Sequence, residues 1–77
     1  MNEAEKRTKL FVLCEAEGYE ELMDLLEVAV GDSVCPGICV NRGCDYTADV
    51  EPDQDAGWCE ECDTGTVQSA LVLAGVI

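Results

Sequence analysis

The chain has no histidine and only four basic residues, against 17 acidic ones, in a length of 77. Without histidine it has no His-based general acid or base, no Ser-His or Cys-His nucleophile pair and no Cys₂His₂ zinc site. The formal net charge of −13 argues against binding to nucleic-acid phosphates and against adsorption to an anionic membrane. The composition therefore points to a binding protein and not to an enzyme.

Long apolar runs are also missing. The run over residues 10–14 is shorter than the core of a signal peptide, which has about 7–15 apolar residues. The run over residues 70–77 falls far short of the roughly 20 residues that cross a membrane. We therefore expect a cytoplasmic protein, and in that reducing compartment clustered cysteines bind metal more often than they form disulfides.

The length allows one domain over residues 1–77, with a core that is marginal by itself. The six cysteines therefore suggest a covalent or metal cross-link that adds stability. Turn-forming residues divide the chain into a helical part over 1–31, a linker over 32–38 and a cysteine-rich part over 39–77.

Two helices are predicted in the first part. Residues 4–17 favour a helix that ends at Gly18, although the continuous apolar run inside it also fits a strand. Residues 19–30 predict a second helix with Gly31 as its stop. Its apolar residues recur at helical spacing and form one stripe: Leu22, Leu25, Leu26, Ala29 and Val30.

Short strands are predicted in the last part, at residues 46–50 and 68–76. The predicted fold is α+β, an N-terminal helical pair packed on a small three-stranded zinc-ribbon-like sheet. We expect the second helix to pack on the apolar C-terminal strand. Such a strand at an edge can also pair with another copy, so both a monomer and a homodimer stay open.

Four cysteines have the spacing of a metal site. Cys39 and Cys44 form a C-x₄-C pair, Cys59 and Cys62 form a C-x₂-C pair, and 14 residues separate the pairs. Two close pairs on two turns can bring four thiolates around one tetrahedral ion, and zinc accepts such a set. Iron accepts the same four sulfurs, so the spacing leaves the choice between the two metals open.

Cys35 offers a rival C-x₃-C pair with Cys39. We prefer Cys44 as the ligand because it directly precedes a predicted strand, but the spacing alone leaves Cys35 open in its place. Cys14 lies in an apolar helix and is predicted to be a buried core thiol. Trp58 precedes the second pair, and we expect it to cover one side of the site.

Acidic residues alternate with other residues over Asp49, Glu51, Asp53 and Asp55. The glycine and twelfth-position residue of an EF-hand are not in place there, so a calcium loop is not indicated. The segment fits a solvated acidic turn. It also fits a row of carboxylates that presents regular negative charge to a basic groove.

The segment CVNRGCDYTADVEPDQDAGWCEEC, followed by TVQSALVLAGVI, resembles a family of short zinc-ribbon-like proteins encoded in tailed phages and prophages. The likeness extends to CEAEGYEELMDLLE and DSVCPGIC. It implies a metal-bound ribbon at Cys39, Cys44, Cys59 and Cys62 and a phage context, without an established activity. Such ribbons usually have glycine after the last cysteine, where this chain has Asp63.

A more distant similarity is to rubredoxin, whose two metal-binding turns resemble CDY and WCEEC, although the first cysteine spacing differs. We therefore expect a small acidic structural-zinc protein that binds a basic protein partner, as a phage-encoded adapter or inhibitor. The alternative is rubredoxin-like electron transfer through iron.

Overall fold

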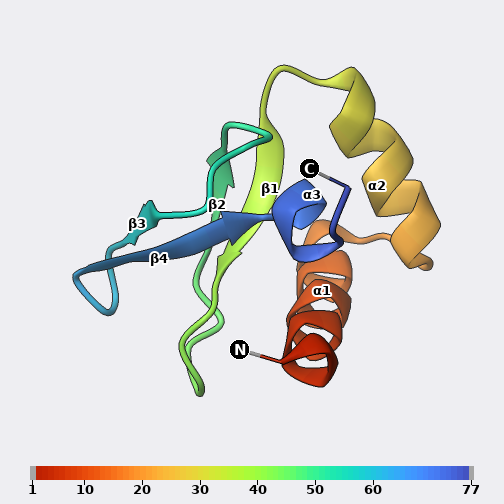
Figure 1. Cartoon of the computed structure of the whole chain (residues 1–77). Coiled ribbons are helices and arrows are strands. Elements are labelled where there is room, and N and C mark those ends of the chain that lie inside the picture. The colour runs from red at the N-terminus through yellow and green to blue at the C-terminus, as the bar shows by residue number, and fades with distance from the viewer. Residues whose placement is uncertain (1, 77) are drawn as a thin grey trace.

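Four strands and three helices form the fold, and the computed structural model describes residues 2–76. The elements in chain order are α1 (Glu3–Glu17), α2 (Leu22–Gly31), β1 (Cys35–Cys39), β2 (Thr47–Val50), β3 (Gly57–Cys59), β4 (Thr64–Ser69) and α3 (Ala70–Leu73). Figure 1 shows the helices gathered on one side, with the β3–β4 hairpin projecting away from them. The α+β prediction is confirmed, but the sheet has four strands instead of three.

Neither β1 nor β3 was among the predicted strands, and β1 is the more important of the two for the fold. The sheet order is β2-β1-β4-β3 with every pair antiparallel, so β1 lies in the middle of the sheet. It occupies residues 35–39, most of which were assigned to a linker because Pro36 and Gly37 favour turns. Pro36 is tolerated because it pairs with β2 only, while the pairing with β4 begins at Gly37.

The predicted strand over residues 68–76 is wrong in its extent. β4 ends at Ser69, whose buried hydroxyl accepts a hydrogen bond from the Val72 N–H at 3.1 Å and starts α3. The same hydroxyl donates to the carbonyl of Pro52 at 2.6 Å. This N-cap favours a helical turn over residues 70–73. The Ser69 hydroxyl satisfies the Val72 N–H, which in a continuing strand would need a partner on a neighbouring strand.

Both N-terminal helices are present. The side chain of Asn2 caps α1 by accepting from the Glu5 N–H at 2.8 Å, and Gly18 ends the helix with a φ of 83°. The strand alternative for residues 10–14 is therefore wrong. Gly31 is not the stop that we predicted, because it lies inside α2 and the extended residue Asp32 follows as the cap.

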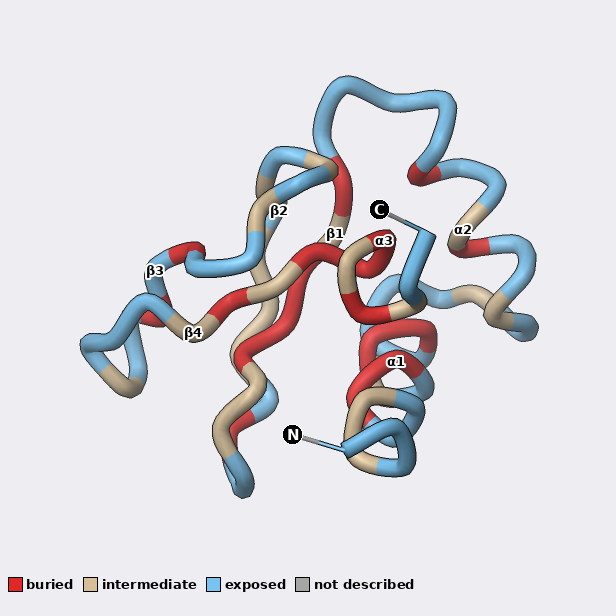
Figure 2. The backbone as a smooth tube through the Cα atoms, in the orientation of Figure 1, coloured by how far each residue is buried: buried red, intermediate tan, exposed pale blue. Residues whose placement is uncertain are grey.

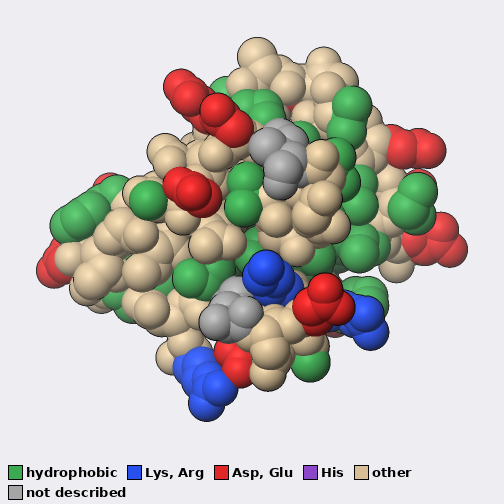
Figure 3. Space-filling view, in the orientation of Figure 1, with side chains coloured by type: hydrophobic (Ala, Val, Ile, Leu, Met, Phe, Trp, Pro, Cys, Tyr) green, Lys and Arg blue, Asp and Glu red, His purple; other side chains and the backbone are tan. Residues whose placement is uncertain are grey.

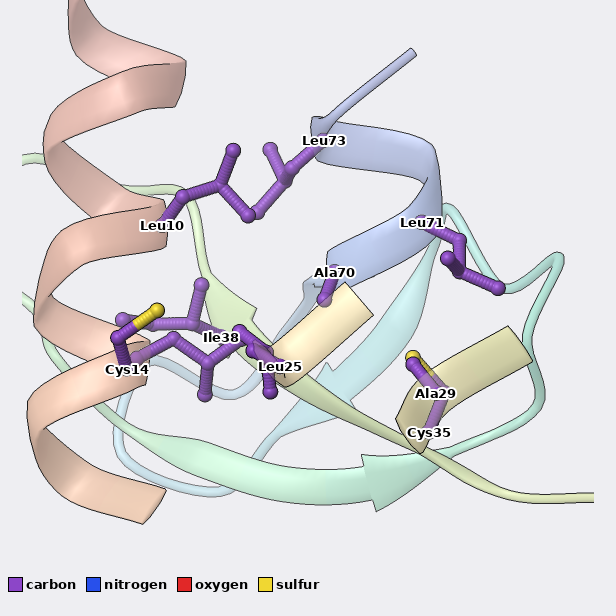
Figure 4. Close-up of a cluster of buried hydrophobic side chains, with 10 residues drawn as sticks. Leu10, Cys14, Leu25, Ala29, Cys35, Ile38, Ala70, Leu71 and Leu73 are labelled. Carbon is purple, nitrogen blue, oxygen red and sulfur yellow. The ribbon is translucent and has the colours of Figure 1, made fainter. Parts of the chain in front are cut away.

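The main core lies between the helices and β1 (Figures 2 and 4). Its buried members come from α1, α2, β1 and α3: Leu10, Leu13, Cys14, Leu25, Ala29, Cys35, Ile38, Ala70, Leu71 and Leu73. Leu25 and Ala29 of the predicted stripe are buried, but Val30 is exposed. The apolar face of α2 packs on α3 instead of on a terminal strand. Cys14 is the core thiol that we predicted, and its burial raises its pKa.

We predict that Gly37→Ala lowers the free energy of unfolding by about 1–3 kcal/mol. A Cβ at this position would lie 2.8 Å from Val50 Cγ2 and 3.0 Å from the carbonyl oxygen of Gln68, in the tightest part of the sheet. Gly31→Ala is the matched control, since its Cβ would meet nothing within 4 Å. Denaturant unfolding should show equal or higher stability for the control. Equal losses in both variants would contradict this packing.

Candidate metal centre

The four cysteines with paired spacing come together at one place. Cys39 ends β1, Cys44 lies in the loop that follows, Cys59 ends β3, and Cys62 lies in the turn before β4. Successive residues of a strand face opposite sides, so Ile38 points to the helical core while Cys39 points to the other cysteines. The four Sγ atoms all lie within 4.8 Å of one another.

The sulfur positions fit a tetrahedral ion. The Sγ atoms of Cys44 and Cys59 are 3.7 Å apart, and those of Cys39 and Cys62 are 4.0 Å apart. Bonds of about 2.3 Å from zinc to sulfur give tetrahedral edges of about 3.8 Å. The cluster could therefore hold a metal ion by its four thiolates, with three of the cysteines buried and Cys62 half-buried.

Cys44, and not Cys35, belongs to this cluster. Cys35 is fully buried in the helical core, and its thiol lies 3.4 Å from the carbonyl oxygen of its neighbour Pro36. The preference for Cys44 was based on its place before a strand, and β2 does begin three residues later, at Thr47. All six cysteines are free thiols in the structure.

Two left-handed residues shape the turns around the cluster. Gly43 has a φ of 79° and directly precedes Cys44, and Asp63 has a φ of 55° directly after Cys62. The Cys62 N–H donates to Cys59 Sγ at 3.4 Å, and the Asp63 N–H donates to the Cys59 carbonyl at 2.8 Å. Asp63 thus adopts the conformation for which glycine is the usual residue, and aspartate is one of the few other residues that do so readily.

The pKa values of three of the clustered thiols shift in different directions. Burial opposes ionisation of Cys39, but hydrogen bonds from Thr66, from the Asn41 backbone and from neighbouring thiols lower its pKa to about 7. The Tyr46 N–H favours the thiolate of Cys44, but burial and the other three thiols raise its pKa to about 12. Burial also raises the pKa of Cys59. A bound metal would displace the remaining protons, so its affinity should rise with pH.

A small polar network supports Cys39. The Thr66 hydroxyl lies 3.2 Å from Cys39 Sγ and 2.9 Å from the Thr64 hydroxyl. The side-chain amide of Asn41 donates to Thr66 Oγ1 at 3.4 Å. A Cys39 thiolate can only accept, so the Thr66 hydroxyl is within reach to donate its proton to that sulfur while its oxygen accepts from Asn41. The cysteine spacing carries no signal for these residues, and the sequence analysis did not identify them.

Lys9 connects α1 to the first cysteine loop, the segment between β1 and β2 that carries Cys44. Its ammonium donates to the carbonyl of Asn41 at 2.9 Å and to the carbonyl of Cys44, and it lies 3.4 Å from an Asp45 carboxylate oxygen. The side chain is largely buried. In the sequence, Lys9 is only one of the four basic residues. The one available signal was its position four residues before Leu13, on the buried face of the helix.

Trp58 does not cover the site. Its neighbours Gly57 and Cys59 face inward along β3, so Trp58 faces outward and is 59% exposed. Tyr46 packs against the cysteine cluster in its place. Burial and the negative charges of Glu60, Cys59 and Glu61 raise the pKa of Tyr46.

No relative adds to this picture. Neither protein-family models, curated proteins nor solved structures match the chain. Within residues 2–76, no helix combines the length and apolar character needed to cross a bilayer. What the site can do therefore follows from its own geometry, a set of four converging sulfurs.

We predict that alanine at any of Cys39, Cys44, Cys59 or Cys62 abolishes stoichiometric binding of one metal ion per chain, because each substitution removes a quarter of the ligands. Cys14→Ala and Cys35→Ala are the controls and should retain the ion. Native mass spectrometry measures both the stoichiometry and the mass of the metal. Loss of the ion in Cys35→Ala with retention in Cys44→Ala would contradict the assignment.

We predict that Thr66→Val weakens metal binding by about 10–100-fold, the usual effect of removing a hydrogen bond to a ligand. Thr66→Ser keeps the hydroxyl that faces Cys39 Sγ and should bind nearly as tightly as the natural chain. Competition with a chromophoric chelator at constant pH measures both affinities. If serine and valine weaken binding equally, the hydroxyl has no role at the metal.

Proposed function

We propose that the protein is a structural-zinc module that binds a basic surface on a partner protein. The observation that carries this proposal is the convergence of four cysteine sulfurs within 4.8 Å. Cys39, Cys44, Cys59 and Cys62 would hold the zinc, which would join the end of β1 to the β3–β4 hairpin. In a chain with so small a core, such a cross-link adds stability that packing alone does not supply.

The number of protein ligands at the metal favours a role in binding a partner over a role in catalysis. A tetrahedral zinc ion with four protein sulfurs has no open position for water or substrate. The chain also has no histidine to act as a general base near neutral pH. We therefore propose that the metal centre stabilises the conformation of a surface that binds a partner.

The surface beside the centre is strongly acidic. Residues 49–63 contain no lysine or arginine, and seven carboxylates in this segment are exposed: Asp49, Glu51, Asp53, Asp55, Glu60, Glu61 and Asp63. The exposed ring of Trp58 lies in the same segment. Such a surface favours a partner rich in lysine and arginine, through charge attraction and contacts between cations and the ring.

A phage-encoded adapter or inhibitor would act in this way, by covering a basic site of a host protein. Zinc with four thiolates adds about −2 to the charge of the chain, which would become about −15. That charge would speed the encounter with a basic partner and repel nucleic acid.

A second candidate, iron-based electron transfer, is favoured by hydrogen bonds to the sulfurs. Cys39 Sγ has the Thr66 hydroxyl 3.2 Å away, and Cys59 Sγ accepts from the Cys62 N–H at 3.4 Å. Bonds of this kind set the reduction potential of iron–sulfur centres. Metal analysis separates the candidates, since iron in four thiolates absorbs visible light and zinc does not.

Binding to a nine-residue arginine peptide tests the acidic surface. Changing Asp49, Glu51, Asp53 and Asp55 to lysine should weaken binding by more than about tenfold. The matched control changes Glu15, Glu17, Glu20 and Glu21 to lysine, which alters the net charge equally at exposed positions elsewhere. Isothermal titration at low and high salt measures both. Equal losses in the two variants, or an affinity unchanged by salt, would contradict the proposal.

A further inference from the structure

α2 carries an apolar face that the core does not use. Leu25 and Ala29 face inward, whereas Met23 and Val30 are 64% and 65% exposed. Leu22 and Leu26 lie between these two groups and are half-buried. At 100° per residue, Leu22, Met23, Leu26 and Val30 form one stripe along the side of the helix.

The stripe continues into a hollow of about 310 Å³ between α1, α2 and the end of α3. Leu10, Leu22, Leu26 and Leu73 form most of its apolar part, and Glu3, Lys6 and Arg7 lie on its α1 side. We call the stripe and the hollow together the α2 face. Apolar surface of this kind beside charged residues is typical of a site where another protein binds.

The two edges of the α2 face carry opposite charges. The edge on α1 is net positive, with Lys6 and Arg7 beside Glu3. On α2, the acidic residues Asp24 and Glu27 are exposed beyond Met23. Figure 3 shows lysine and arginine side chains below hydrophobic ones, with one acidic side chain between two of the basic ones and further acidic side chains at the right-hand margin.

The other two bases of the chain are already engaged. Lys9 pairs with Asp45 and Arg42 pairs with Glu5, while Lys6 and Arg7 have no ion pair within residues 2–76. Lys6 and Arg7 are therefore the two cations of the described structure that remain available to an acidic partner.

We propose that the α2 face binds a second copy of the chain. A two-fold axis that runs along the apolar stripe, between the two edges, would place the basic edge of one copy against the acidic edge of the other, twice. The stripe would then pack on itself, which removes Met23 and Val30 from water. The highly acidic remainder of the surface would oppose any other pairing of two copies, because like charges would meet.

The mass of the full-length chain in solution tests the apolar part of this interface. We expect a dimer at about 100 µM by light scattering after size exclusion, and a monomer for Met23→Glu. Val28→Glu is the matched control: Val28 is also exposed, but it points about 140° away around the helix. It should remain dimeric with the same added charge. A natural chain that stays monomeric at about 1 mM, or a dimer that Met23→Glu leaves intact, would overturn the proposal and leave the face to another partner.

Reversing the charges of the two edges tests the relative orientation of the two copies. Changing Lys6 and Arg7 to glutamate should give a monomer, and so should changing Asp24 and Glu27 to lysine. The chain with all four changes should dimerise again, because both edges are reversed together. A monomer from the fourfold variant, with circular dichroism and metal content unchanged, would overturn the paired edges. None of these residues is among the cysteines of the cluster, so the outcome is independent of the metal proposal.

Discussion

The central strand β1 is the element on which both halves of the molecule depend. Its residue Ile38 packs among the helices, and the next residue, Cys39, points to the sulfur cluster on the other side. Because the side chains of a strand alternate, one backbone segment holds two separate cores in a fixed relation. The helical part and the metal-binding part therefore cannot shift independently while β1 stays paired with β2 and β4.

The few basic side chains and the many acidic ones have different surroundings in this chain. Two of its four bases connect α1 to the first cysteine loop: Lys9 is buried there, and Arg42 pairs with Glu5 at the surface. The exposed acids are left without such partners along residues 49–63. These two bases stabilise the loop that carries Cys44, and the exposed acids are the feature on which the proposal of a basic partner rests.

Sequence reasoning succeeded where the signal was local. Helix-forming residues and Gly18 predicted α1 and its end, since glycine readily adopts the left-handed conformation that stops a helix. The two cysteine pairs predicted the cluster, because cysteines that are only a few residues apart in the sequence must also lie close together in space. Turn chemistry misled at Pro36 and Gly37, which lie in a strand. At Gly37 that strand is packed too closely for a larger side chain.

The sequence by itself determined the α+β class, the two N-terminal helices, the paired cysteines and the acidic character of the chain. The tertiary structure decided the fourth strand, the short helix after Ser69, the exclusion of Cys35 from the cluster and the outward position of Trp58. The physical reason is distance along the chain. Helix periodicity and turn spacing act within a few residues. The pairing of β1 with β4 joins residues about 30 positions apart, and the contact of Lys9 with Cys44 joins residues 35 positions apart.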